Sequence, residues 1–147
     1  MIRSNKRLRL CAALIVVNLC IIWGNSLLPG AVSGAISDFV RDLIGAIFAL
    51  LGFPPGSGGG GGLLRKLAHF TEFACLGALL AWLFGMLRKT PWLALGCGSL
   101  AGAIDETIQR FVPDRGPSIF DVGIDTAGAA TGIGLLLIIH FIRKKKH

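Results

Sequence analysis

Long apolar segments separated by short charged ones run along the chain and predict four membrane-spanning helices. The spans are expected at about residues 10–29, 66–87, 91–112 and 118–142. Leu10–Leu28 carries no charge and is close to the roughly 20 residues that a helix needs to cross a bilayer. The third segment is uncharged only over Thr90–Ile104, so its helix must continue through Asp105 and Glu106. For the same reason the fourth must begin before Asp125, and both helices carry carboxylates into the membrane or to its edge.

The first apolar segment has an alternative interpretation. Its core, Leu10–Ile22, follows basic residues and is followed by small residues at 30–35, which is also the pattern of a secretory signal peptide. A charged start and an apolar core are common to both kinds of segment. We expect the segment to be a span.

A segment between the first two spans has an amphipathic pattern. Apolar residues recur at three- and four-residue steps over residues 35–51, with charged residues on the opposite side. This pattern predicts a helix that lies flat in the outer membrane interface, with Ser33 or Ser37 as its amino-terminal cap. The Gly-rich segment 54–62 that follows predicts a flexible loop, because it lacks the Lys and Ser/Thr spacing of a phosphate-binding loop.

The charge distribution orients this arrangement. The chain is 53% apolar and 16% charged, against about 25% charged in soluble domains, and its net charge is +7. Ten of the 15 Lys and Arg residues, and none of the eight Asp and Glu residues, fall on the side that holds both termini. The positive-inside bias therefore predicts one multi-pass membrane domain over residues 1–147, with both termini in the cytoplasm. Because the basic residues are not gathered on one face of a soluble fold, we expect membrane lipids and no nucleic acid as partners.

Polar and small residues form stripes on three of the predicted spans. Spacings of three and four residues put each set on one helical face: Arg65, His69 and Glu72; Gly98, Gly102, Asp105 and Gln109; and Asp121, Asp125, Gly128 and Gly132. Because the third and fourth spans are antiparallel, we expect their glycines to meet near the membrane centre, where small residues allow close packing. Their carboxylates then meet at the outer end, level with the polar face of the second span.

Ionisable residues in these stripes are candidates for a functional site. A carboxylate inside a span is costly unless it is paired or faces a wet cavity, so such residues indicate function. The candidates for acid/base catalysis are His69, Glu72, Asp105, Asp121 and Asp125. The candidates for binding are Arg65, Lys66, Glu106, Gln109, Arg110 and Arg115. The structural alternative is that these charges only pair with one another, for example Arg65 with Glu72 or Arg115 with Asp121.

Several of these residues are also potential ligands of a divalent cation. His69 and Glu72 lie three residues apart on one helical face, so their side chains point the same way and could bind a metal or pass a proton. Asp105, Asp121 and Asp125 add oxygen ligands of the type that divalent ions accept, although no defined metal-binding spacing is present. The sequence alone therefore leaves both metal binding and the cofactor unknown.

Three motifs in the second part of the chain are specific. They occupy Arg65–Phe73, Asp105–Arg115 and Asp121–Gly128. Together they resemble the VanZ-like family of bacterial membrane proteins, from about Leu63 to the carboxyl terminus, and the end of the first span is also similar. The family positions that carry over are Lys66, His69, Glu72, Asp105, Glu106, Gln109, Arg115, Asp121 and Asp125. The resemblance implies a cell-envelope protein of the bacterial plasma membrane without a settled reaction, since the founding member is associated with low-level resistance to the glycopeptide teicoplanin.

Three functions are compatible with these residues. The first is an envelope protein that affects teicoplanin susceptibility or handles envelope lipids, with Arg65 and Arg115 among the residues that hold an anionic headgroup, a lipid-linked precursor or a glycopeptide. The second is a membrane-embedded enzyme that acts on such a precursor or on a peptide, with Glu72 or Asp105 as general base and His69 as proton carrier. The third is a small transporter or proton-coupled channel, which is disfavoured because every ionisable candidate lies in the outer half of the spans.

Overall fold

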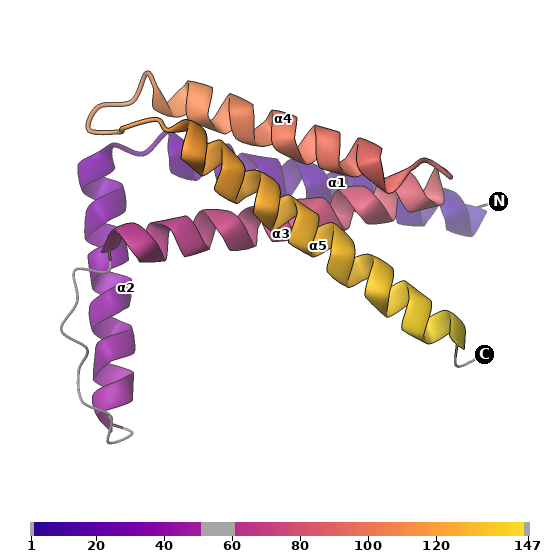
Figure 1. Ribbon diagram of the computed structural model, residues 1–147, viewed down its shortest axis with the longest axis horizontal. Helices are drawn as coiled ribbons and strands as arrows, with labels where there is room; N and C mark the ends of the chain where they lie inside the picture. Colours follow the sequence, from indigo (N-terminus) through magenta and orange to yellow (C-terminus); the bar gives the residue numbers. More distant parts are fainter. Residues whose placement is uncertain (1, 51–60, 146–147) are drawn as a thin grey trace.

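The computed structural model describes residues 2–50 and 61–145, and its regular structure is helical throughout these ranges (Figure 1). Five helices follow one another: α1 Ile2–Ser26, α2 Gly30–Leu50, α3 Gly61–Met86, α4 Pro91–Gln109 and α5 Ile119–Lys145. The predicted all-α fold is therefore confirmed. Residues 54–60 of the predicted Gly-rich loop lie outside the described residues, while the last two glycines of that segment begin α3.

Three of the helices are long and apolar enough to cross a membrane. They contain the stretches Asn5–Ser26, Gly62–Met86 and Ile119–Lys145. The 19-residue helix α4, which includes Asp105 and Glu106, is not among the spanning candidates in the described part of the chain. Length and composition thus support three of the four predicted spans, and the four-span count is not confirmed.

The central helix is α3, which contacts all four other helices. Its most extensive packing is with α5. Phe73 and Leu76 of α3 are almost fully buried, and they form the core together with Cys11 and Ile22 of α1 and Ala94 of α4. Large apolar side chains on the outer surfaces of α1 and α5 remain exposed, which is typical of helix surfaces that face lipid.

Glycines allow α3 and α5 to approach closely. A Cβ atom on Gly128 would lie 2.5 Å from the carbonyl oxygen of Phe70, and one on Gly132 would overlap the backbone of α3. The expectation that these α5 glycines meet Gly98 and Gly102 of α4 is therefore wrong. The physical reason is that α5 packs against two helices, and its closest backbone approach, which only small residues permit, is made with α3.

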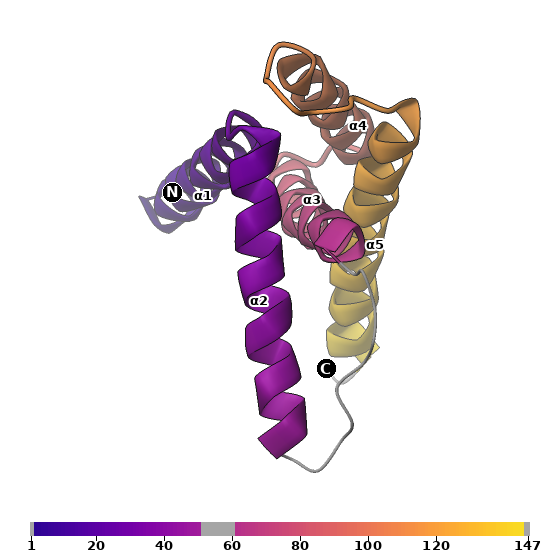
Figure 2. The ribbon, with the colours of Figure 1, turned by 90° about the vertical axis from the view of Figure 1, so that its left-hand side faces the viewer.

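In contrast to the other helices, α2 runs across the end of the bundle (Figures 1 and 2). It begins at Gly30, before the expected start at residue 35, because the carbonyl of Pro29 accepts the N–H of Ser33 at 3.0 Å, which is the first hydrogen bond of the helix. Ser33 and Ser37 lie inside the helix, so the prediction that one of them caps it is wrong. Apolar residues of α2 are exposed, and Phe39 is 69% exposed. Such a surface is what an interfacial helix buries among lipid headgroups.

Candidate functional site

At one end of the bundle α1 and α4 end and α3 and α5 begin (Figure 1), and polar side chains gather there. They come from these four helices and from the loop between α4 and α5. We call this group the polar cluster, and it consists of Asn25, Ser26, Arg65, Lys66, His69, Glu72, Asp105, Glu106, Gln109, Arg115, Asp121 and Asp125. The structure thus brings ten of the eleven candidate residues together, at the level that the helical stripes predict.

Gln109 is at the centre of the hydrogen-bond network and is 2% exposed. Its Nε2 donates to Oδ2 of Asp105 at 2.8 Å and to Oγ of Ser26 at 3.3 Å. Its Oε1 accepts a hydrogen bond from Nη2 of Arg65 at 2.9 Å. Because a glutamine amide offers two donor hydrogens and one acceptor oxygen, this single side chain joins α1, α3 and α4. It thereby positions Arg65 and Asp105 relative to each other.

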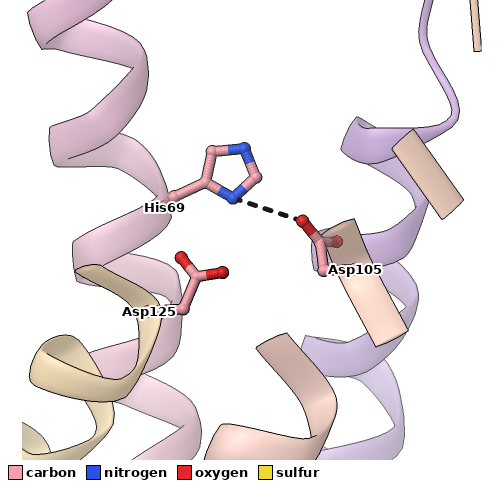
Figure 3. A group of neighbouring side chains, drawn as sticks. All are labelled: His69, Asp105 and Asp125. Carbon is pink, nitrogen blue, oxygen red and sulfur yellow. Dashed lines mark ion pairs between the residues drawn. The ribbon is translucent and has the colours of Figure 1, made fainter. Parts of the chain in front are cut away.

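His69, Asp105 and Asp125, from three different helices, lie close together (Figure 3), and Asp105 is the hydrogen-bond partner of Gln109. Nδ1 of His69 lies 3.7 Å from Oδ2 of Asp105, which is too long for a hydrogen bond and within ion-pair distance for a protonated imidazole. Asp105 and Asp125 are 0% and 1% exposed. A Cβ atom on Gly102 would lie 3.0 Å from Cβ of Asp125, so the glycine lets Asp125 lie against α4. Two buried carboxylates and one imidazole therefore lie close to one another.

Lys66 and Glu106 both contact the beginning of α5. Nζ of Lys66 lies 3.2 Å from Oδ1 of Asp121, and both side chains are partly exposed. An exposed pair of this kind contributes about 1 kcal/mol or less. Oε2 of Glu106 accepts the backbone N–H of Ser118 at 2.9 Å, beside the start of α5, where a carboxylate is favoured by the helix dipole. Glu106 therefore supports the start of α5, while Lys66 is accessible from outside.

Arg115, in the loop between α4 and α5, holds the end of α1. Its Nε donates to the carbonyl oxygen of Leu28 at 3.0 Å, and its Nη2 donates to the carbonyl oxygen of Asn25 at 2.7 Å. Asn25 in turn donates from Nδ2 to Oε1 of Glu72 at 2.6 Å. Burial lowers the pKa of the Arg115 guanidinium from its usual range, and the charge of Arg65 lowers that pKa further. The two hydrogen bonds of Arg115 thus connect the α4–α5 loop to the backbone at the end of α1.

Two small cavities of about 120 Å³ each lie in the polar cluster. Both are lined by Arg65 and His69, so these side chains lie between the two. The first cavity is also lined by Lys66, Glu106, Gln109, Asp121 and Asp125. The second is also lined by Asn25, Glu72 and Arg115 and by residues of α2. Each volume is that of about four water molecules at roughly 30 Å³ per molecule, so a small polar group fits.

A comparison with known protein families gives a match over residues 14–140, to the family described as VanZ/LLP1. The chain belongs to the VanZ/LLP1 family. The resemblance inferred from the three sequence motifs is therefore confirmed, and the matched range also takes in the second half of α1 and all of α2 and α4. No curated protein and no solved structure matches the chain.

One candidate residue of this VanZ/LLP1-family chain, Arg110, lies outside the polar cluster. It directly follows the last residue of α4, and its side chain is exposed. The alternative in which the charges only pair with one another is wrong for the two pairs that it named. Among the described residues there is no ion pair between Arg65 and Glu72 or between Arg115 and Asp121.

Asn25 and Ser26 belong to the polar cluster although neither was among the candidate residues. Ser26 is fully buried and accepts the hydrogen bond from Gln109, and Asn25 donates to Glu72. These partners lie 83 and 47 residues further along the chain. The available signal was a pair of polar residues at the end of an apolar span, within the part of α1 that the VanZ/LLP1 match includes.

Proposed function

We propose that this VanZ/LLP1-family chain is a protein of the bacterial plasma membrane with four spans, α4 among them, and with both termini in the cytoplasm. The 19 residues of α4 would extend about 28 Å at roughly 1.5 Å per residue, close to the roughly 30 Å of the hydrocarbon core. This helix packs against α1, α3 and α5 (Figure 2). With the positive-inside bias, four spans place the polar cluster at the outer side of the membrane.

Cysteine labelling tests this topology. In spheroplasts, a membrane-impermeant maleimide is expected to label Gly116→Cys, in the loop between α4 and α5, and to leave Lys89→Cys, between α3 and α4, unlabelled. The unsubstituted chain is the control, because its four cysteines lie within helices α1, α3 and α4. Labelling of Lys89→Cys, or of neither position before lysis and both after it, would contradict the four-span arrangement.

We infer that the polar cluster binds the phosphate group of an envelope lipid or of a lipid-linked envelope precursor. The observation that supports this is a cavity of about 120 Å³ that Arg65, Lys66 and His69 line together from the first turns of α3. The guanidinium of Arg65 carries five N–H donors, and the described contacts use one of its nitrogens, on Gln109. Arg and Lys are typical ligands of phosphate oxygens, and Arg binds them through two parallel hydrogen bonds.

The surroundings of the cavity favour a lipid over a soluble phosphate. Leu63 and Leu67, on either side of Arg65 in the chain, are 65% and 52% exposed. An apolar chain lying on such a surface would leave its charged headgroup level with the cavity. A cavity of about 120 Å³ is large enough for a phosphate and too small for a whole glycopeptide. An effect on teicoplanin susceptibility would therefore follow from the handling of lipid, and not from enclosing the antibiotic.

Binding of a short polyprenyl diphosphate to the purified full-length protein tests this function. The Arg65→Ala substitution is expected to raise the Kd by about ten- to one-hundredfold, since a hydrogen bond to a charged group contributes about 1.5–3 kcal/mol. Arg41→Ala is the matched control, because Arg41 lies on α2 and pairs with Asp38 and Asp42. Isothermal titration calorimetry in detergent measures the Kd, and circular dichroism checks that both variants fold.

Equal Kd values for the wild-type protein and Arg65→Ala would contradict phosphate binding at this cavity. Recovery of the diphosphate intact would support a binding function. Release of orthophosphate that His69→Ala abolishes would instead favour a membrane-embedded enzyme. Growth in graded teicoplanin, with cells that carry the wild-type or the Arg65→Ala chain, shows whether the binding matters for glycopeptide susceptibility, and we expect the variant to lose any protection.

A further inference from the structure

The deepest part of the polar cluster joins three side chains of the types that bind metal ions. His69 comes from α3, Asp105 from α4 and Asp125 from α5, and they face one another (Figure 3). One donor atom from each, a ring nitrogen or a carboxylate oxygen, can be chosen so that all three lie within 4.8 Å of one another. Two ligand atoms on one ion are at most about 4.2 Å apart for bonds of roughly 2.1 Å. Small side-chain rotations are therefore enough to close the group on an ion.

The carboxylate oxygens of this group point to a cation independently of the spacing. Oδ1 of Asp105 and Oδ2 of Asp125 are buried and have no hydrogen-bond donor among the described residues. Burying a carboxylate oxygen without a partner is costly, and buried charges in proteins are paired or coordinate metals. Among the described residues, the other oxygen of Asp105 accepts a hydrogen bond from the amide of Gln109. A positive charge between α4 and α5 would therefore stabilise these two oxygens.

The charges of the polar cluster, counted with every carboxylate ionised, suit a doubly charged cation. Its carboxylates are Glu72, Asp105, Glu106, Asp121 and Asp125, and its permanent cations are Arg65, Lys66 and Arg115. With a neutral imidazole and ionised carboxylates, the cluster carries two more negative than positive charges. Uncompensated charge is costly among buried side chains. One divalent cation would make the cluster neutral.

We propose that His69, Asp105 and Asp125 bind a divalent cation. One imidazole nitrogen and two carboxylate oxygens suit Mn²⁺ and Zn²⁺ better than Ca²⁺ or Mg²⁺, which prefer oxygen alone. Three protein ligands leave coordination positions for a further oxygen ligand, as in open metal sites. His69 and Asp125 line the same cavity as Arg65 and Lys66, so that oxygen would be one of the phosphate group. This last step rests on the proposed function, whereas the cation site rests on its own geometry.

A titration of Mn²⁺ alone into the purified full-length protein tests the cation site without any lipid. Electron paramagnetic resonance measures the free Mn²⁺, and one bound ion per wild-type chain is expected. Asp105→Asn and Asp125→Asn keep the side-chain shape. Each is expected to raise the Kd for Mn²⁺ at least about tenfold, since mutation of a residue that only hydrogen-bonds to a metal ligand already lowers metal affinity by about that factor. Asp42→Asn is the matched control, because this carboxylate is 71% exposed on α2.

Thermal unfolding of the same proteins gives a second readout. Mn²⁺ is expected to raise the Tm of the wild-type and Asp42→Asn proteins, with reversal by EDTA, because a ligand that binds the folded state stabilises it. At the same Mn²⁺ concentration a smaller rise in Tm is expected for each Asn variant, and His69→Gln replaces either one that fails to fold. A wild-type protein that binds no Mn²⁺ and no Zn²⁺ would overturn the proposal, as would equal Kd values for the wild-type and Asp125→Asn proteins.

The outcomes also separate this proposal from the proposed function. Binding of the polyprenyl diphosphate in EDTA with unchanged affinity, together with no binding of Mn²⁺, would overturn the cation site and leave phosphate binding by Arg65 and Lys66 standing. Binding of Mn²⁺ without any binding of the diphosphate would support the cation site and contradict the proposed function. A Kd for the diphosphate that rises in EDTA, in the wild-type protein but not in Asp125→Asn, would support both.

Discussion

Replacement of Gly132 by alanine is expected to disrupt the packing of α5 on α3 and to lower the free energy of unfolding by about 3 kcal/mol or more. A Cβ atom at this position would overlap the carbonyl group of Ala74. That obstacle is helix backbone, which cannot move aside as a flexible side chain does, so the two helices must separate. Thermal unfolding in detergent, followed by circular dichroism, measures the loss.

Gly134→Ala is the matched control for this prediction. It lies two residues further along α5, and in the described part of the chain the Cβ that the substitution adds meets no atom within 4 Å apart from its chain neighbours and the adjacent backbone of α5. Because alanine is a better helix former than glycine by about 1 kcal/mol, this variant is expected to unfold at the wild-type temperature or above it. If both substitutions lowered the free energy of unfolding by a similar amount, the close approach of α5 to α3 would not explain the need for glycine at position 132.

Arg115→Ala is expected to lower the free energy of unfolding by about 3 kcal/mol or more, because two hydrogen bonds from a charged donor contribute about 1.5–3 kcal/mol each. The side chain is 9% exposed and donates to the carbonyl oxygens of Leu28 and Asn25 at the end of α1. Its removal leaves both carbonyls without that donor and releases the α4–α5 loop from α1. The same unfolding experiment measures the effect.

Two further variants show whether geometry or charge is responsible at this position. Arg115→Lys keeps the positive charge and cannot reach two carbonyls in the fork geometry of a guanidinium, so an intermediate loss of stability is expected. Arg110→Ala removes an exposed arginine five residues earlier, and surface changes of this kind are usually within about 0.5 kcal/mol. A loss at Arg110 as large as that at Arg115 would contradict a specific role of Arg115 in holding α1.

The level of the candidate site along the bundle could be predicted from the sequence. His69 and Glu72, or Asp121 and Asp125, are three or four residues apart, and an α-helix puts such residues on one face. The helix ends followed from the same local patterns to within about three residues, whereas α1, α2 and α3 begin earlier than the apolar segments suggested. Local sequence is sufficient here because helical hydrogen bonds join residues only four positions apart.

The partners across helices could not be predicted in this way. Gly128 faces α3 and not the glycines of α4, and Glu106 supports the start of α5 through Ser118. Arg115 is a candidate for binding by its residue type, yet its described contacts are with the backbone of α1. These outcomes depend on the rotation of each helix about its own axis, which is settled by packing against several neighbours at once.

The sequence by itself determined an all-helical membrane protein of the VanZ/LLP1 family whose polar residues lie at one level, because periodicity, apolar length and motif are local properties of the chain. Only the tertiary structure decided which of these residues meet. In this structure, donor atoms of His69, Asp105 and Asp125 lie within a few ångströms of one another, and Gln109 donates a hydrogen bond to Ser26. Arg110 lies outside the polar cluster. The physical reason is that contacts between distant residues arise from the close packing of four helices, and no single segment contains that information.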